Sequence, residues 1–140
     1  MRTFRKTIIA LICILLIGVT AFFIIFRNRP KKPFENLKTS DIVSATVCIS
    51  PPGETIQIVD LEELTHCLND IIIYNKDNSY NEYDGQGVVF TLVMADGTQT
   101  EIMEYNPFFV IDGVGYKTEY EPCEALNHYA NGLLNEAINE

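Results

Sequence analysis

Basic residues are scarce over most of this 140-residue chain. Seven of the ten lysines and arginines lie at or before Lys32, whereas all nineteen acidic residues follow it. With three cations against nineteen acids, the part after Lys32 has a net charge of −16. A protein that binds nucleic acid needs cations to neutralise phosphates and release counterions. The sequence therefore predicts no nucleic-acid partner, and its acidic surface favours cations or basic protein surfaces.

Motifs that identify common catalytic sites are absent. The chain has no G-x-S-x-G nucleophile motif, and Gly85-Gln86-Gly87 lacks the third glycine and the preceding strand of a dinucleotide site. His66 and His128 are the only histidines, and neither has a serine or cysteine at a nucleophile spacing. We therefore predict no catalytic residue and no bound cofactor. Carboxylate chemistry is the alternative, because an acidic chain contains many candidate pairs.

The cysteines are too far apart for a zinc knuckle. Cys48, Cys67 and Cys123 share no close spacing, and the adjacent His66 and Cys67 would point about 100° apart on a helix. We predict no metal site at these residues. In an exported domain, a disulfide between Cys67 and Cys123 would join two predicted helices, with buried free thiols as the alternative.

An acidic loop begins like an EF-hand but does not complete one. Asp77-x-Ser79-x-Asn81 has the alternating oxygen ligands, yet Glu82 stands where glycine is required and Val88 where the bidentate glutamate is required. An EF-hand is therefore excluded. A looser calcium site formed by Asp77, Glu82 and Asp84 is an alternative to a solvated acidic loop.

One long apolar segment is present near the N-terminus. From Ile8 to Phe26 the chain is apolar apart from Gly18 and Thr20, and a helix of this length nearly spans a hydrocarbon core of about 30 Å. We predict a single-pass transmembrane anchor over residues 1–26, which contacts the lipid bilayer through residues 8–26. Cations flank both ends of the segment, so the positive-inside rule does not set its orientation.

The short basic start followed by an apolar run resembles an export signal, which favours an extracytoplasmic domain at the cell membrane. Two kinds of processing are alternatives to an intact anchor. Val19-Thr20-Ala21 has the form of a signal-peptidase site, but the apolar run continues to Phe26 and leaves no polar region before a cut. Ile12 before Cys13 departs from a lipoprotein signal, so a membrane-buried thiol is expected there.

The remainder predicts one acidic α+β domain over residues 34–140, preceded by a Pro/Lys spacer over residues 27–33. Period-two patterns and turn residues predict a small antiparallel sheet of six or seven short strands. The expected strands are 42–49, 55–59, 71–74, 88–95, 98–105, 108–111 and 114–117. Asp96-Gly97 and Asp112-Gly113 each predict a hairpin with a type I′ turn.

Two helices are expected to pack on this sheet. Asp60 can cap a helix over residues 61–69, and Pro122 fits the first turn of a closing helix. The closing helix carries small and apolar residues at spacings of three and four, which should face the sheet. These residues are Cys123, Leu126, Ala130, Leu133 and Ala137.

Tyrosines gather in the loop over residues 75–87 and in the two hairpins. Aromatic rings with one polar end are favoured at protein interfaces. We predict a partner-binding surface around Tyr80 and Tyr83, with core packing as the alternative for these rings.

Several turn and strand segments occur together behind the basic start, the single apolar span and the Pro/Lys spacer. They are Phe90-Thr91-Leu92, Asp96-Gly97-Thr98, Tyr105-Asn106-Pro107-Phe108 and Ile111-Asp112-Gly113-x-x-Tyr116. In this order the chain resembles uncharacterised membrane-anchored proteins of Gram-positive bacteria with a small extracytoplasmic domain. The resemblance implies placement and fold, and it carries over no functional residue.

The sequence thus predicts a non-enzymatic interaction or sensing module, anchored in a bacterial membrane, whose partner is another envelope or membrane protein. The first alternative is a membrane-tethered hydrolase, or an accessory subunit of one, that uses carboxylates. The second is an acidic adaptor that faces the cytoplasm.

Overall fold

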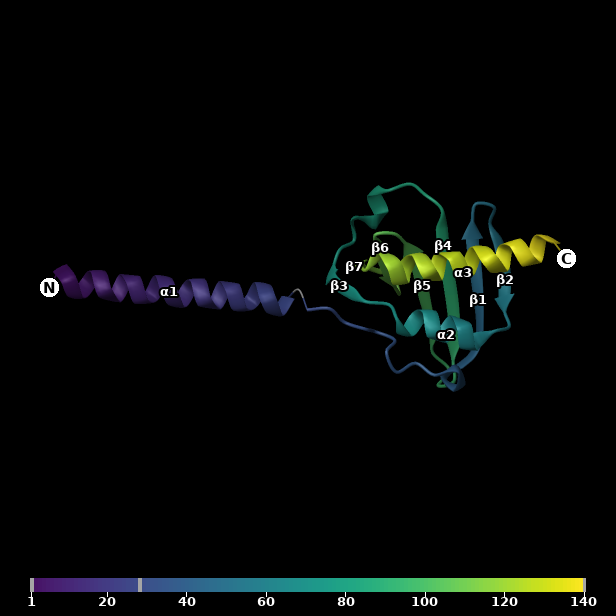
Figure 1. The fold of residues 1–140 in the computed structure, drawn as a ribbon, viewed down its shortest axis with the longest axis horizontal. Helices are drawn as coiled ribbons and strands as arrows, with labels where there is room; N and C mark the ends of the chain where they lie inside the picture. The colour runs from purple at the N-terminus through teal and green to yellow at the C-terminus, as the bar shows by residue number, and fades with distance from the viewer. Residues whose placement is uncertain (1, 28, 140) are drawn as a thin grey trace.

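The computed structural model describes residues 2–27 and 29–139, with side chains from Lys6 to Phe26 and from Arg29 onward. Helix α1 (Arg2–Arg27) projects away from the rest of the chain (Figure 1). All of its described side chains are exposed, and Lys6–Phe26 is long and apolar enough to cross a membrane. The predicted N-terminal apolar helix is therefore confirmed.

The other elements form an α+β domain, as the sequence predicts. Seven strands make one antiparallel sheet in the order β2-β1-β4-β5-β6-β7-β3. Their bounds are β1 Ile42–Ser50, β2 Glu54–Ile58, β3 Ile73–Lys76, β4 Gly87–Met94, β5 Gln99–Tyr105, β6 Phe108–Ile111 and β7 Val114–Thr118. Short 3₁₀ turns, η1 (Thr39–Asp41) and η2 (Ser79–Glu82), lie in the connections.

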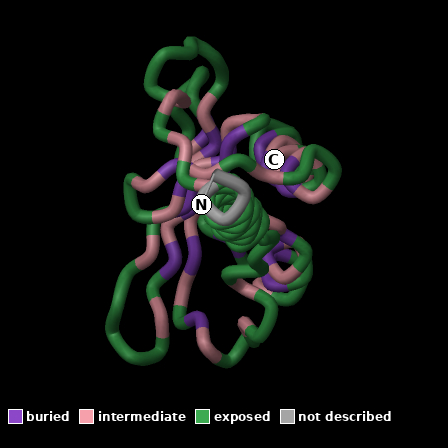
Figure 2. The backbone as a smooth tube through the Cα atoms, turned by 90° about the vertical axis from the view of Figure 1, so that its left-hand side faces the viewer, coloured by how far each residue is buried: buried purple, intermediate pink, exposed green. Residues whose placement is uncertain are grey.

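Helices α2 (Leu61–Asn69) and α3 (Tyr120–Asn139) lie on the same side of the sheet, and most of the buried residues lie between the two layers (Figure 2). Asp60 caps α2 as predicted, because its carboxylate accepts from the backbone N–H groups of Glu62 and Glu63. Alternation along the central strands places one set of apolar side chains beneath the helices. This set includes Val47, Ile49, Val88, Phe90, Leu92 and Ile102.

Two details of the predicted elements are wrong, namely the buried face of the closing helix and the first residue of the third strand. In α3 the buried stripe continues from Ala130 to Leu134, whereas Leu133 is only half-buried and Ala137 is exposed. A spacing of four keeps Leu134 over the sheet, because each helical turn contains 3.6 residues. The strand expected from residue 71 begins at Ile73, since the backbone N–H of Ile71 donates to Leu68 at the end of α2.

The two Asp-Gly turns differ in conformation. Asp112 and Gly113 both have positive φ values, +48° and +77°, as a two-residue type I′ turn between β6 and β7 requires. Of Asp96 and Gly97, only Gly97 has a positive φ, at +86°. The turn between β4 and β5 is instead a three-residue loop, closed by the backbone bond from Met94 N–H to Thr98 O, so the type I′ prediction is wrong there.

The segment predicted as a spacer is partly attached to the sheet. Lys31 and Ile73 exchange two backbone hydrogen bonds of 2.8 Å, which adds a one-residue bridge to the edge strand β3. The ring of Phe34 then packs edge-on against Phe109, with 6.3 Å between the ring centroids. The edge strand β3 is thus paired with a residue that lies shortly after the end of α1 in the sequence.

Candidate functional site

A cavity of about 380 Å³ lies where three parts of the domain meet. These are the N-terminal half of α3, the turn between β5 and β6, and the loop that precedes β4. We call this space the polar cavity. Its walls are formed by Tyr83, Asp84, Gly85, Gln86, Glu104, Tyr105, Asn106, Pro107, Phe108, Glu124 and Asn127. Three carboxylate and three carboxamide residues thus line one space.

Glu104 is the most unusual residue of the polar cavity. It lies on the helix-facing side of β5, two residues after the core residue Ile102, and it is only 2% exposed. Burying a carboxylate costs several kcal/mol unless hydrogen bonds replace its hydration. Among the described residues, no lysine or arginine forms an ion pair with it. A charge at a core position is therefore held by neutral groups.

Three donors surround the Glu104 carboxylate. Its Oε1 accepts from the backbone N–H of Asn106 and from the Cys123 thiol, both at 3.2 Å. Its Oε2 accepts from Asn127 Nδ2 at 2.6 Å. Asn131 Nδ2 donates to Asn127 Oδ1 at 2.9 Å, which orients the Asn127 amide so that its NH₂ group faces Glu104. The carboxylate is thus fixed by a network that spans β5 and α3.

Glu124 supplies a second carboxylate at the wall of the polar cavity, and its side chain is 35% exposed. Its Oε2 accepts from Asn106 Nδ2 at 3.3 Å, and its Oε1 lies 3.3 Å from His128 Nε2. Asn106 therefore joins the two acids, since its backbone N–H serves Glu104 and its side chain serves Glu124. The Glu124 charge is also the main reason why the pKa of Tyr120 is raised.

One acceptor in the polar cavity has no partner. The side-chain oxygen of Asn106, Oδ1, is buried and receives no hydrogen bond. The contact with Glu124 sets the orientation of this amide, because exchanging its oxygen and nitrogen would place two oxygens together. Buried acceptors usually have a partner, so this atom marks unused hydrogen-bonding capacity.

The thiol of Cys123 serves as a donor rather than a nucleophile. Burial first, and the Glu104 charge second, raise its pKa far above the ordinary cysteine value, so the reactive thiolate is disfavoured. Burial likewise raises the pKa of the half-buried Cys67. Both residues are free thiols in the structure, and the Cys67–Cys123 disulfide stays a prediction for the oxidised protein.

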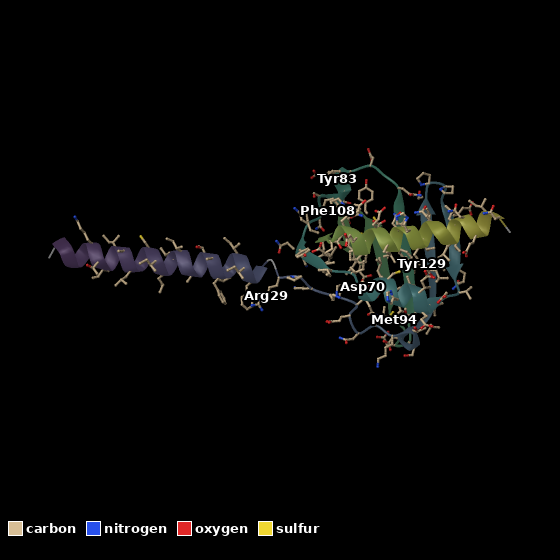
Figure 3. The ribbon with its side chains drawn as sticks, viewed as in Figure 1. Arg29, Asp70, Tyr83, Met94, Phe108 and Tyr129 are labelled. Atoms are coloured by element: carbon tan, nitrogen blue, oxygen red, sulfur yellow. The ribbon has the colours of Figure 1, made fainter. Side chains whose placement is uncertain are left out.

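The two tyrosines of the predicted partner surface occupy different environments. Tyr83 is 58% exposed, and its ring lies 5.6 Å from that of Phe108 at the wall of the polar cavity (Figure 3). Tyr80 is half-buried, and its hydroxyl donates to Gly113 O while its ring lies over Gly115. Tyr80 therefore positions the loop, and of the two only Tyr83 presents an exposed ring at the polar cavity.

The acidic loop is stabilised by hydrogen bonds within it and by a lysine of the neighbouring strand β7. Asp77 accepts from the backbone N–H and the hydroxyl of Ser79, and Lys117 Nζ lies 3.7 Å from the same carboxylate. Over residues 2–27 and 29–139, no group of three His, Cys, Asp or Glu residues is arranged to hold a metal ion. Asp77, Glu82 and Asp84 are thus not assembled into the alternative calcium site.

Sequence patterns did not identify Glu104, Asn106, Glu124 or Asn127 as site residues. The available signal was Glu104 itself, since period-two alternation places it on the same face as Ile102. An acid at a core position is a sign of special function or cost. A protein-family search found no matching family model for the chain, and no curated protein or solved structure matches it.

Proposed function

We propose that this protein is a membrane-anchored, non-enzymatic interaction module, and that its extracytoplasmic acidic domain contacts a partner protein at the polar cavity and Tyr83. The observation that carries the proposal is the position of a buried carboxylate, Glu104, in a cavity whose rim bears an exposed tyrosine ring. Convergent polar groups in a concave site favour a binding role, and tyrosines are enriched where proteins meet.

Anchoring is supported by the exposure of α1. An uninterrupted apolar helix with no described side chain buried against the domain needs an apolar environment, and a bilayer supplies one. Export is supported by the basic start of the segment and by the resemblance to membrane-anchored bacterial proteins. A cleaved signal sequence would have the same composition, so anchoring is a separate point to test.

The environments of Cys123 and Glu104 support a non-enzymatic function for the polar cavity. The Cys123 thiolate is disfavoured, and both Glu104 oxygens already accept hydrogen bonds. The second candidate is a carboxylate-dependent hydrolase, which the convergence of Glu104 and Glu124 favours. Turnover of a glycoside or peptide substrate by the purified chain, abolished by Glu124→Gln, would replace the interaction module with this candidate.

Site-directed photocrosslinking in native membranes tests the contact surface. A benzophenone amino acid replaces Tyr83 in one variant and Val59, which is 89% exposed outside the polar cavity, in the control variant. We expect a discrete crosslinked product that is several-fold more abundant from position 83. Equal yields from both positions would contradict the proposed surface.

Labelling of intact cells tests the placement of the domain. A cysteine is added after Glu140, and an impermeant maleimide is applied to intact and to lysed cells, with the unaltered chain as the background control. We expect labelling of intact cells and retention of the chain in the membrane fraction. Labelling only after lysis would place the domain in the cytoplasm, and release from membranes would indicate a cleaved signal.

A further inference from the structure

We infer that the polar cavity binds a cationic side chain, an ammonium or guanidinium group, presented by the partner polypeptide. This inference rests on the proposed interaction function and names the chemistry of its partner. It follows from the hydrogen-bonding capacity, the charge and the aromatic wall of the polar cavity.

Four donors at the polar cavity are directed at its own glutamates, and Gln86 Nε2 donates to Pro51 O. Asn127 Nδ2, the Cys123 thiol and the Asn106 backbone N–H point to Glu104, and Asn106 Nδ2 points to Glu124. Asn127 Oδ1 is used by Asn131, whereas Asn106 Oδ1 is buried without a partner. An ionised carboxylate accepts only, with about four lone-pair positions. The unused hydrogen-bonding capacity of Asn106 Oδ1 and Glu124 is therefore for accepting, which favours a ligand that donates hydrogen bonds.

The charge of the polar cavity selects a cationic donor. Of the described residues, His128 is the only base that lies within 4 Å of either cavity glutamate, and no lysine or arginine pairs with them. A domain with a net charge of −16 attracts cations over a distance of about a Debye length. A guanidinium or ammonium group would supply both the missing charge and several N–H donors.

The wall and size of the polar cavity fit a side chain of this type. The exposed ring of Tyr83, backed by Phe108, offers an aromatic face to a cation beside the carboxylates. A volume of about 380 Å³ lies at the lower end of ordinary ligand sites and exceeds that of a single side chain. An adjacent exposed tyrosine also suits the backbone of a polypeptide better than it suits a small free amine.

Nuclear magnetic resonance of the full chain in detergent micelles tests the inference. The probes are the capped peptide Gly-Gly-Arg-Gly-Gly, its citrulline counterpart, which lacks the charge, and agmatine as a free amine. We expect the arginine peptide to shift the side-chain amide signals of Asn106 and Asn127 saturably, with the citrulline peptide at least about tenfold weaker. We expect agmatine to bind more weakly than the arginine peptide.

Two charge-matched variants locate the binding. Glu124→Gln should weaken the arginine peptide about tenfold, because it removes a carboxylate at the cavity wall. Glu136→Gln removes an exposed acid from the same helix outside the polar cavity and should change the affinity less than about twofold. Unchanged amide spectra of the unliganded variants away from the substitution would show that both fold.

Three results would overturn the inference: equal binding of the arginine and citrulline peptides, equal effects of the two substitutions, or agmatine binding as tightly as the peptide. The first two would leave only a general acidic field, and the third would assign the site to a free amine. Crosslinking through position 83 without arginine selectivity would reject this inference and keep the proposed interaction function. Arginine selectivity without crosslinking would keep the cation-binding chemistry of the polar cavity and reject the proposed contact with a partner protein.

Discussion

Two of the hollows that helix α3 borders differ in character. Beside its N-terminal half lies the polar cavity, and beside its C-terminal half lies a groove of about 720 Å³, which we call the apolar groove. The apolar groove is lined by Thr39, Ile56, Gln57, Val59, Asp60, Leu61, Glu62, Leu133, Glu136 and Ala137. It is the larger of the two, and it also contains acids.

Glu104 in the polar cavity differs in exposure from the acids of the apolar groove. In the apolar groove Asp60, Glu62 and Glu136 are exposed, and Asp60 caps α2. In the polar cavity Glu104 is almost fully buried, where a carboxylate contributes little stability compared with an apolar residue. Helix capping explains Asp60, whereas Glu104 lies at a core position where an apolar residue would be expected, and this difference is the basis of the proposed function.

Removing Glu104 should have the largest effect on stability. Glu104→Ala leaves the Asn106 N–H, Asn127 Nδ2 and the Cys123 thiol without their acceptor, so we expect the free energy of unfolding to fall by about 3 kcal/mol. Urea unfolding of the full chain in micelles, followed by circular dichroism, measures this change. Glu136→Ala should change it by less than about 0.5 kcal/mol. A loss below about 1 kcal/mol for Glu104→Ala would show that the network contributes little.

Gly115→Ala should destabilise the loop that carries the tyrosines. A Cβ atom at this position would lie 2.3 Å from the backbone oxygen of Asp77 and 2.6 Å from the Tyr80 ring. Relieving this overlap should cost about 2 kcal/mol and loosen the attachment of the loop. Urea unfolding and faster amide hydrogen exchange over residues 77–83 would show both effects. Exchange that stays at the wild-type rate would contradict the assigned role of Tyr80.

Gly132→Ala should instead increase the free energy of unfolding. Gly132 lies in the C-terminal half of α3, and an added Cβ atom would meet nothing within 4 Å. Alanine is favoured over glycine in a helix interior, so we expect a gain of about 0.8 kcal/mol in the free energy of unfolding. The same urea assay checks this value. A loss of stability would mean that this side of α3 is more crowded than the structure shows.

The smallest expected effect is on acid sensitivity. Hydrogen bonds from Ser79 and from Thr98 lower the pKa values of Asp77 and Asp96 in the folded protein. Their contribution to stability is therefore complete above the unfolded aspartate pKa of about 3.9 and is lost as the pH falls through the lower folded values. Thermal unfolding between about pH 5 and pH 2 should lose part of its pH dependence in Asp77→Asn. An unaltered profile would contradict the assigned hydrogen bonds.

Most of the fold could be predicted from local patterns. Alternation located the strands, Asp60 located the start of α2, and Asp112-Gly113 located a type I′ turn, because each depends on residues close in sequence. Predictions failed where contacts between residues of different elements determine the local backbone conformation. Ile71 donates a backbone hydrogen bond back to Leu68 of α2 instead of opening a strand, and the loop at Asp96 is one residue longer than a type I′ turn.

The polar cavity could not be predicted in the same way. Glu104 and Glu124 lie in different elements, and only the packing of α3 on β5 brings them to one space. The predicted tyrosine surface includes Tyr83, which lies at the polar cavity. It also includes Tyr80, whose ring packs over Gly115 instead. Residue types alone do not show which of two loop tyrosines faces outward.

The most direct test of the central claim combines the contact surface with the carboxylate beside it. Crosslinking through position 83 in native membranes would be compared among the otherwise wild-type chain, Glu124→Gln and Glu136→Gln. If a partner binds at the polar cavity through a cationic side chain, the product should decrease several-fold in Glu124→Gln and stay unchanged in Glu136→Gln. Equal product from all three chains would contradict the claim that the polar cavity is where this protein meets its partner.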